Sequence, residues 1–129
     1  MAVTLERFNE VMDALERGEI RVAQKEDGEW KVNSWVKEVI LDGFKLGRLV
    51  QMGRFVDKDT FPERNFTVED AVRFVPGGSS VRRGAYMAPG TIIMPPSYVN
   101  VGAYVDTGKE KQNAKEKKED ILPKNSKER

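Results

Sequence analysis

The chain has 129 residues, of which 39% are hydrophobic and 33% charged, and its net charge is +1. This length fits one domain with an appendage, the near-neutral charge predicts no nucleic-acid or membrane-surface partner, and no apolar run approaches the roughly 20 residues of a membrane span. Histidine and cysteine are absent, which excludes disulfides, cysteine nucleophiles, triads with a histidine base and zinc sites built from these ligands, so we expect no metal site.

The first part of the chain predicts a helix followed by a β-hairpin. Residues 4–17 repeat apolar side chains at helical spacing, and Gly18 stands where such a helix would end. Asp27-Gly28 separates two short stretches and is a strong signal for a tight hairpin turn. We expect the apolar face of this helix to enter the core through Leu5, Phe8, Val11, Met12 and Leu15.

A second helix is predicted over residues 34–46, with Asn33 as its cap and Gly47 at its end. Its apolar face consists of Val36, Val39, Ile40 and Phe44. Residues 48–66 predict one or two strands and then a loop. The Thr67–Asp70 spacing predicts a short capped helical turn, and a strand that runs into a Pro-Gly-Gly turn follows it.

From Val81 onward the sequence repeats every six residues. Written in sixes it reads VRRGAY, MAPGTI, IMPPSY, VNVGAY and VDTG, and each group opens with an aliphatic residue. The fifth residue of each of the four full groups is small: Ala85, Thr91, Ser97 and Ala103. This period is typical of a left-handed parallel β-helix, in which the leading residue points into the coil, whereas an antiparallel strand pair would need a period of two. Three hexads make one coil, so the pattern predicts about one and a half coils.

The repeat stops at Lys109, whose ammonium group would fall on an inward position where burying a charge is costly. Residues 109–129 carry eight basic and five acidic side chains, so we expect a disordered charged tail; a basic arm for RNA or membrane is the alternative. The predicted fold is an α+β N-terminal domain over 1–72, the first one and a half coils of a left-handed parallel β-helix over 73–108, and the tail.

The segment "RFVPGGSSVRRGAYMAPGTIIMPPSYVNVGAYVDTG", residues 73–108, resembles the tetrahydrodipicolinate N-succinyltransferases of bacterial lysine and diaminopimelate biosynthesis. A looser similarity runs from about residue 10 through "GEIRVAQKEDGEWKVNSWVKEVIL". The string "MPPSYVNVGAYVD" is the specific part, because other hexapeptide acyltransferases share the six-residue period but not this run of residues.

The resemblance implies a cytoplasmic homotrimer with active sites between subunits. Its activity would be the transfer of succinyl from succinyl-CoA, as co-substrate, to the amine of a ring-opened dicarboxylate substrate. The resemblance assigns an arginine of an "R-x-V-P" stretch to substrate binding, and that position is Arg73 here. A planar guanidinium suits this role because it can hold a carboxylate by two hydrogen bonds.

The sequence departs from the family after Gly108. The family continues with "TMVD", whose Asp belongs to the substrate site, and with the coils that bind coenzyme A; nothing after Gly108 matches them, and Asp106 is a different residue. We therefore expect no catalytic residue in this chain, which reads as a truncated N-terminal portion that is inactive alone. The alternatives are a non-catalytic interaction module that pairs with a full-length relative, and another acyltransferase of the same repeat class.

Overall fold

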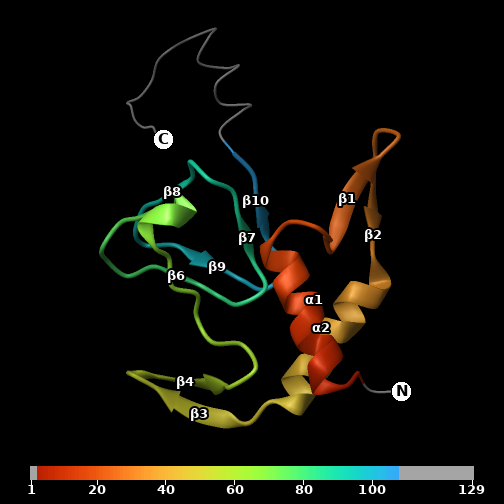
Figure 1. Cartoon of the computed structure of the whole chain (residues 1–129), viewed down its shortest axis with the longest axis horizontal. Coiled ribbons are helices and arrows are strands. Elements are labelled where there is room, and N and C mark those ends of the chain that lie inside the picture. Colours follow the sequence, from red (N-terminus) through yellow and green to blue (C-terminus); the bar gives the residue numbers. More distant parts are fainter. Residues whose placement is uncertain (1–2, 108–129) are drawn as a thin grey trace, which may run out of the picture. The chain divides into compact units, whose positions relative to one another are not determined.

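The computed structural model describes residues 3–107, so the predicted tail lies outside the described residues. These residues form two compact units. The helical unit comprises residues 3–65, 80–86 and 98–104, and the second unit comprises 66–79, 87–97 and 105–107. Among the described residues there is no helix with the length and apolarity needed to cross a membrane. Figure 1 gives the element labels used below.

The first helix, α1, spans Leu5–Glu16, as predicted. The hydroxyl of Thr4 accepts a hydrogen bond of 3.1 Å from the backbone N–H of Arg7, which satisfies one of the free donors at the helix start. The chain leaves the helix through Gly18, whose φ of +77° is a conformation that glycine adopts without strain. Of the predicted face, Leu5 is exposed, and the other four residues are buried.

The predicted hairpin consists of β1 (Ala23–Glu26) and β2 (Glu29–Val32), paired antiparallel. Asp27 and Gly28 both have positive φ, at 53° and 81°, as a type I′ turn requires. Asn33 occupies the cap position of the next helix, but the capping contact predicted for it is wrong. Its side chain instead donates a hydrogen bond of 2.6 Å to the carbonyl oxygen of Arg21, which ties the chain before the hairpin to the chain after it.

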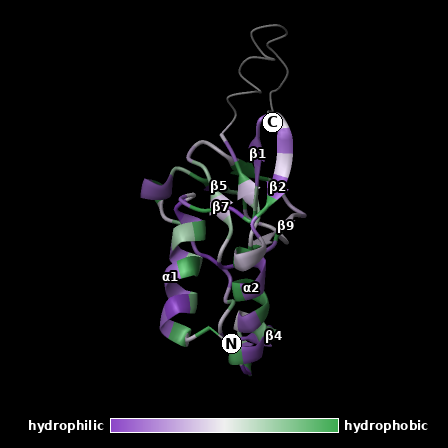
Figure 2. Ribbon diagram, turned by 90° about the vertical axis from the view of Figure 1, so that its right-hand side faces the viewer, coloured by the Kyte–Doolittle hydropathy of each residue, from purple (hydrophilic) through white to green (hydrophobic). Residues whose placement is uncertain are grey.

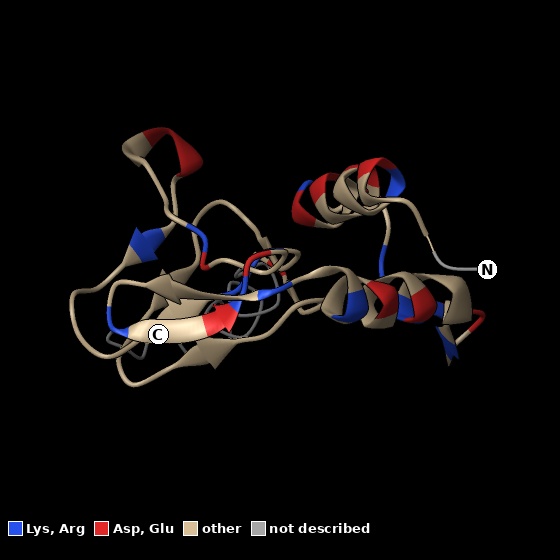
Figure 3. Cartoon of the chain, turned by 90° about the horizontal axis from the view of Figure 1, so that it is seen from below, with Lys and Arg blue, Asp and Glu red and all other residues tan. Residues whose placement is uncertain are grey.

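The second helix, α2, spans Ser34–Leu46, and the predicted bounds are confirmed. Gly47 ends it in an extended conformation, without the left-handed geometry common at helix ends. A Cβ on Gly47 would collide with the hydroxyl of Thr60, so close approach of the chain explains this glycine. Both helices present polar residues of either charge sign on their outer faces (Figures 2 and 3).

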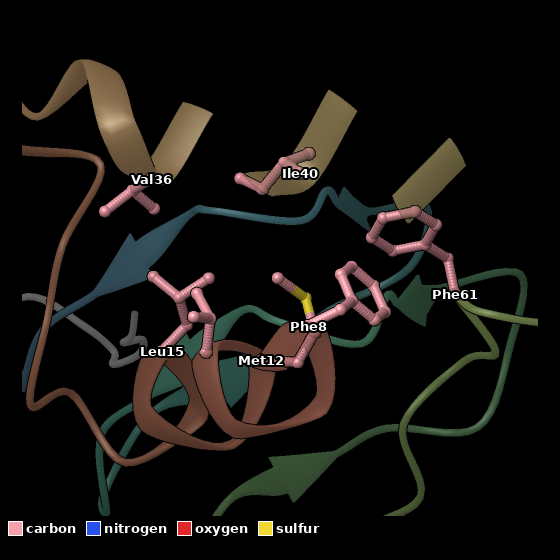
Figure 4. Close-up of a cluster of buried hydrophobic side chains, with 7 residues drawn as sticks. Phe8, Met12, Leu15, Val36, Ile40 and Phe61 are labelled. Carbon is pink, nitrogen blue, oxygen red and sulfur yellow. The ribbon is translucent and has the colours of Figure 1, made fainter. Parts of the chain in front are cut away.

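Two strands follow α2, β3 (Leu49–Met52) and β4 (Phe55–Lys58), in an antiparallel hairpin. The loop after β4 then enters the core through Phe61, which is 2% exposed. The Phe61 ring stacks on Phe44 at 4.3 Å between centroids and meets the edge of Phe8 at 5.3 Å. Figure 4 shows this cluster, whose buried members are Phe8, Val11, Met12, Leu15, Val36, Ile40 and Phe61.

The helical unit also contains a parallel strand pair from the repeat region. This pair joins β6 (Ser80–Val81) to β9 (Tyr98–Val99) in register Val81↔Val99. Beside them, the N–H of Tyr86 donates to the carbonyl of Ala103 at 2.9 Å. Tyr86 is the first residue of β7 (Tyr86–Met87), and Ala103 directly precedes β10 (Tyr104–Val105). Strands β7 and β10 are hydrogen-bonded neighbours.

The second unit contains the predicted helical turn, η1 (Val68–Asp70), and the strands β5 (Arg73–Phe74) and β8 (Ile92–Ile93). The Asp70 carboxylate accepts a hydrogen bond of 2.8 Å from the Thr67 N–H, as the predicted capping pattern requires. Strands β5 and β8 pair in parallel, in register Phe74↔Ile93.

The six-residue spacing of the sequence is visible in the strands. Five two-residue strands, β6 to β10, begin at 80, 86, 92, 98 and 104. The leading residues of the first three hexads, Val81, Met87 and Ile93, are buried. The burial expected of these three residues is therefore confirmed, and the fold is α+β, with two described helices and short strands.

Candidate functional site

Arg73, to which the family resemblance assigns substrate binding, lies on β5 in the second unit. Side chains alternate between the two faces of a strand, and here Phe74 points inward and packs its ring edge-on against Phe66 at 5.7 Å. Arg73 therefore points the other way and is exposed. Its strand partner Ile92 is also exposed, at 43%, while Ile93 is buried. The outer face of β5 and β8 thus combines one cation with an aliphatic side chain.

The backbone of Arg73 is held while its side chain is free. Its N–H donates a hydrogen bond of 2.9 Å to the carbonyl of Thr91, and the following Val75 N–H bonds to Ile93 at 3.1 Å. The guanidinium makes no ion pair and no side-chain hydrogen bond with the residues that the structure describes. An anchored strand therefore presents an uncommitted cation to solvent.

Three other arginines, all in the helical unit, are committed to carboxylates. Arg64 lies 3.7 Å from Glu16, Arg83 lies 3.9 Å from Asp13, and Arg82 pairs with Asp57. Their side chains are between 14% and 23% exposed, which is low for arginine. These pairs offset the cost of burying the guanidinium groups, so they are structural partners within the unit. Arg73 differs because none of the residues that the structure describes pairs with its guanidinium.

The chemistry open to Arg73 is the binding of an anion. A free guanidinium can hold one carboxylate by two parallel hydrogen bonds, and the neighbouring Ile92 can contact the carbon skeleton of the same molecule. Within residues 3–107 no group of three or more acidic side chains comes together in a way that could hold a metal ion. This face therefore offers recognition of a carboxylate, and a base or acyl-binding groups would have to come from elsewhere.

A pocket of about 300 Å³ in the helical unit was not anticipated from the sequence. It opens between β4 and the strand pair β6 and β9, and Asp57 and Arg82 both line it; we call it the Asp57 pocket. Its residues come from four separate segments with no common spacing, so no pattern along the chain could have pointed to it.

Comparison with known proteins supports the resemblance to the tetrahydrodipicolinate N-succinyltransferases for the N-terminal part of this chain. Residues 2–46 match the family model described as "Tetrahydrodipicolinate N-succinyltransferase N-terminal". The 2,3,4,5-tetrahydropyridine-2,6-dicarboxylate N-succinyltransferase of Psychrobacter cryohalolentis is 44% identical over 91 residues, which make up 64% of this chain and 33% of the relative. The enzyme of the same name from Legionella pneumophila (strain Corby) is 43% identical over 89 residues, or 63% of this chain and 32% of the relative.

A third relative, the enzyme of that name from Pectobacterium atrosepticum, is 44% identical over 95 residues, which cover 67% of this chain and 34% of the relative. The matched part of the chain thus spans about a third of the length of the curated relatives. The N-terminal resemblance to tetrahydrodipicolinate N-succinyltransferases is confirmed, and Arg73 remains a prediction from the motif.

Proposed function

We propose, from the premise that the N-terminal part of this chain is homologous to the tetrahydrodipicolinate N-succinyltransferases, that the chain supplies the substrate-binding Arg73 of such an enzyme. The single observation that carries this proposal is the exposed guanidinium of Arg73 on an anchored strand, with no partner among the described residues. Arg73 would bind one carboxylate of the dicarboxylate substrate, and the aliphatic surface of Ile92 would lie against the carbon chain.

The reaction proposed is acyl transfer from succinyl-CoA as co-substrate. The substrate amine attacks the thioester carbonyl carbon, a C–N bond forms, the C–S bond breaks, and coenzyme A leaves as a thiol that takes up the proton lost from nitrogen. Arg73 would take no proton in this step. Its contribution would be to hold the dicarboxylate so that the amine faces the thioester, since correct orientation lowers the barrier of a two-substrate reaction.

We further propose that residues 73–108 begin a left-handed parallel β-helix, with residues 1–72 as the preceding α+β domain. The strand starts at intervals of six and the buried Val81, Met87 and Ile93 support this. So does the Ser80↔Tyr98 register, because strands that pair in parallel three hexads apart stack one coil on the next. By the same family reasoning, the assembled enzyme would be a homotrimer with each site completed by a neighbouring subunit.

A second candidate function is a non-catalytic module that pairs with a full-length relative. Its support is the apolar surface exposed on both hairpins of the helical unit: Trp30 and Val32 on β2, and Leu49 and Val56 on β3 and β4. Large exposed apolar residues gathered on strands are a feature of protein interfaces. Co-expression with a full-length relative discriminates the two proposals. The module would form mixed oligomers with the relative, and the succinyltransferase activity of the relative would then depend on the ratio of the two chains.

A chimaera tests the catalytic proposal. Residues 1–107 of this chain would be joined to the remainder of the Legionella pneumophila relative, and release of the coenzyme A thiol would be followed. We expect turnover that requires both succinyl-CoA and tetrahydrodipicolinate. Arg73→Ala should lower kcat/KM about 100-fold, as expected when a charge-assisted pair is lost, whereas the exposed Arg54→Ala control should leave it within about twofold. A folded, trimeric chimaera without turnover would contradict the proposal.

A further inference from the structure

The Asp57 pocket is built entirely within the helical unit and is distinct from the face that carries Arg73. Its base is β6, which has backbone partners on two sides. On one side β6 pairs with β9, and on the other the N–H of Arg64 donates a hydrogen bond of 2.6 Å to the carbonyl of Val81. The N–H of Arg83 also reaches the carbonyl of Pro62 at 2.9 Å. A base fixed in this way gives the pocket a defined shape before any ligand arrives.

The wall of the pocket is apolar and aromatic. Met52, Phe55 and Val56 contribute from the β3–β4 hairpin, Phe61 from the loop, and the ring of Tyr98 from β9. Phe55 is 42% exposed and Tyr98 is also exposed, so aromatic surface is open to solvent at this site. A volume of about 300 Å³ lies at the small end of ligand pockets, which suits a single ring with a short substituent.

The free polar groups of the pocket are mainly hydrogen-bond acceptors. The carboxylate of Glu63 has no ion pair or hydrogen bond with any residue in the described part of the chain. Asp57 contributes a second carboxylate, of which one oxygen is engaged by Arg82. The Ser80 hydroxyl has no described partner either, and the phenol of Tyr98 donates to the side chain of Asn100 at 3.4 Å, which leaves its oxygen as an acceptor.

Arg82, the one cation among the described residues of the lining, is not available to an anion. Its guanidinium pairs with Asp57, donates a hydrogen bond of 3.3 Å to Asn100, and lies over the Phe61 ring at 5.4 Å from the centroid. The charge of Arg82 is therefore balanced by Asp57, and the carboxylate of Glu63 leaves the lining with one net negative charge.

We propose that the Asp57 pocket binds a small planar organic cation, of the amidine, guanidine or aromatic ammonium class. The cationic N–H groups would donate to Glu63, to the free oxygen of Asp57 and to Ser80, and the flat body would stack among Phe55, Val56 and Tyr98. Two interactions favour a cation in this pocket. Charge-assisted hydrogen bonds to carboxylates are stronger than neutral ones, and aromatic faces attract positive charge. An anionic ligand would meet the unpaired Glu63 and would have to displace Asp57 from Arg82.

Benzamidine is the probe, and its neutral and anionic isosteres benzamide and benzoate are the matched controls. Each would be titrated into the ¹⁵N-labelled 129-residue protein while backbone amide shifts are followed. We expect benzamidine to shift the amides of Phe55, Ser80 and Arg82 with a Kd of about 1 mM, and both isosteres to bind at least about tenfold more weakly.

Two variants at exposed positions test whether the negative charge of the pocket is needed for benzamidine binding. Glu63→Gln keeps the shape of the side chain and should weaken benzamidine about fivefold to tenfold, whereas Glu6→Gln on α1 should have no effect. Val56→Lys places a cation on an exposed position of the wall and should abolish benzamidine binding. The proposal is overturned if benzamidine causes no shift confined to the pocket by about 10 mM. It is equally overturned if benzoate binds as tightly as benzamidine, or if Glu63→Gln binds as the unmodified protein does.

Discussion

A Cβ atom on Gly43 would overlap the ring of Phe8, so α2 can lie this close to α1 only because residue 43 is glycine. Gly43 is buried inside the last turn of α2, and within a helix glycine is intrinsically less favourable than alanine by about 1 kcal/mol. The packing between the two helices therefore outweighs the local preference. Figure 4 shows the ring of Phe8 in the cluster that this contact allows.

Gly43→Ala should destabilise the protein although it raises helix propensity. We expect the free energy of unfolding to fall by about 1–3 kcal/mol, because the added methyl group forces Phe8 and Phe61 out of their places. Urea unfolding followed by circular dichroism measures this. In the double variant with Phe8→Leu, alanine should cost less than it does alone; a stabilised Gly43→Ala protein would mean that the helices separate freely.

Phe61→Ala should remove the aromatic centre of the core. Phe61 contacts Phe8 and Phe44 and is buried, so its truncation should lower the free energy of unfolding by about 3–5 kcal/mol. Phe55→Ala is the matched control, because Phe55 is of the same type but exposed on β4, and we expect a change under about 1 kcal/mol. Equal losses in the two variants would contradict the assignment of Phe61 to the core.

Local sequence patterns were sufficient for the elements that depend on local interactions. The bounds of α2 and the turn at Asp27-Gly28 were predicted because helical periodicity and left-handed turn residues act over a few neighbours. Phe61 was missed because it lies in a loop without periodicity and is buried only through contacts with distant residues. Asn33 was misread for the same reason, since its partner Arg21 is twelve residues away.

The candidate site was predictable only in part. The role of Arg73 was predicted from a sequence motif. Whether an arginine has a carboxylate partner depends instead on the tertiary contacts that bring acidic residues to Arg64, Arg82 and Arg83. Nothing along the chain indicates which of these four arginines receives a carboxylate partner in the fold. The Asp57 pocket likewise depends on the approach of separate segments, so it could be found only from the structure.

Amide exchange should separate the helices from the repeat region. The strands β6 to β10 are two residues long, whereas α1 and α2 are continuous hydrogen-bonded helices around the core. We expect the amides of residues 86–105 to exchange at least about tenfold faster than the central amides of both helices, since short ladders open locally. Protection of 86–105 above that of the helices would show that the repeat region is the more stable part.

The 129-residue chain should not catalyse succinyl transfer by itself. Its sequence after Gly108 has no counterpart of the "TMVD" motif, so the proposed substrate site would have Arg73 without its acidic partner. We expect no thiol release from succinyl-CoA above the uncatalysed rate when tetrahydrodipicolinate is present. Turnover that depends on both substrates would show that the chain carries a complete site.

The most direct test of the account is a binding measurement on Arg73 itself. In a full-length relative, the arginine aligned with Arg73 would be replaced by alanine, and calorimetry would follow pyridine-2,6-dicarboxylate, a stable planar dicarboxylate, and succinyl-CoA separately. We predict that the dicarboxylate loses at least about tenfold in affinity, the loss expected for a guanidinium–carboxylate pair, while succinyl-CoA changes by less than about twofold. An equal loss for both ligands would mean that the arginine supports the fold, and would contradict its assignment to the substrate.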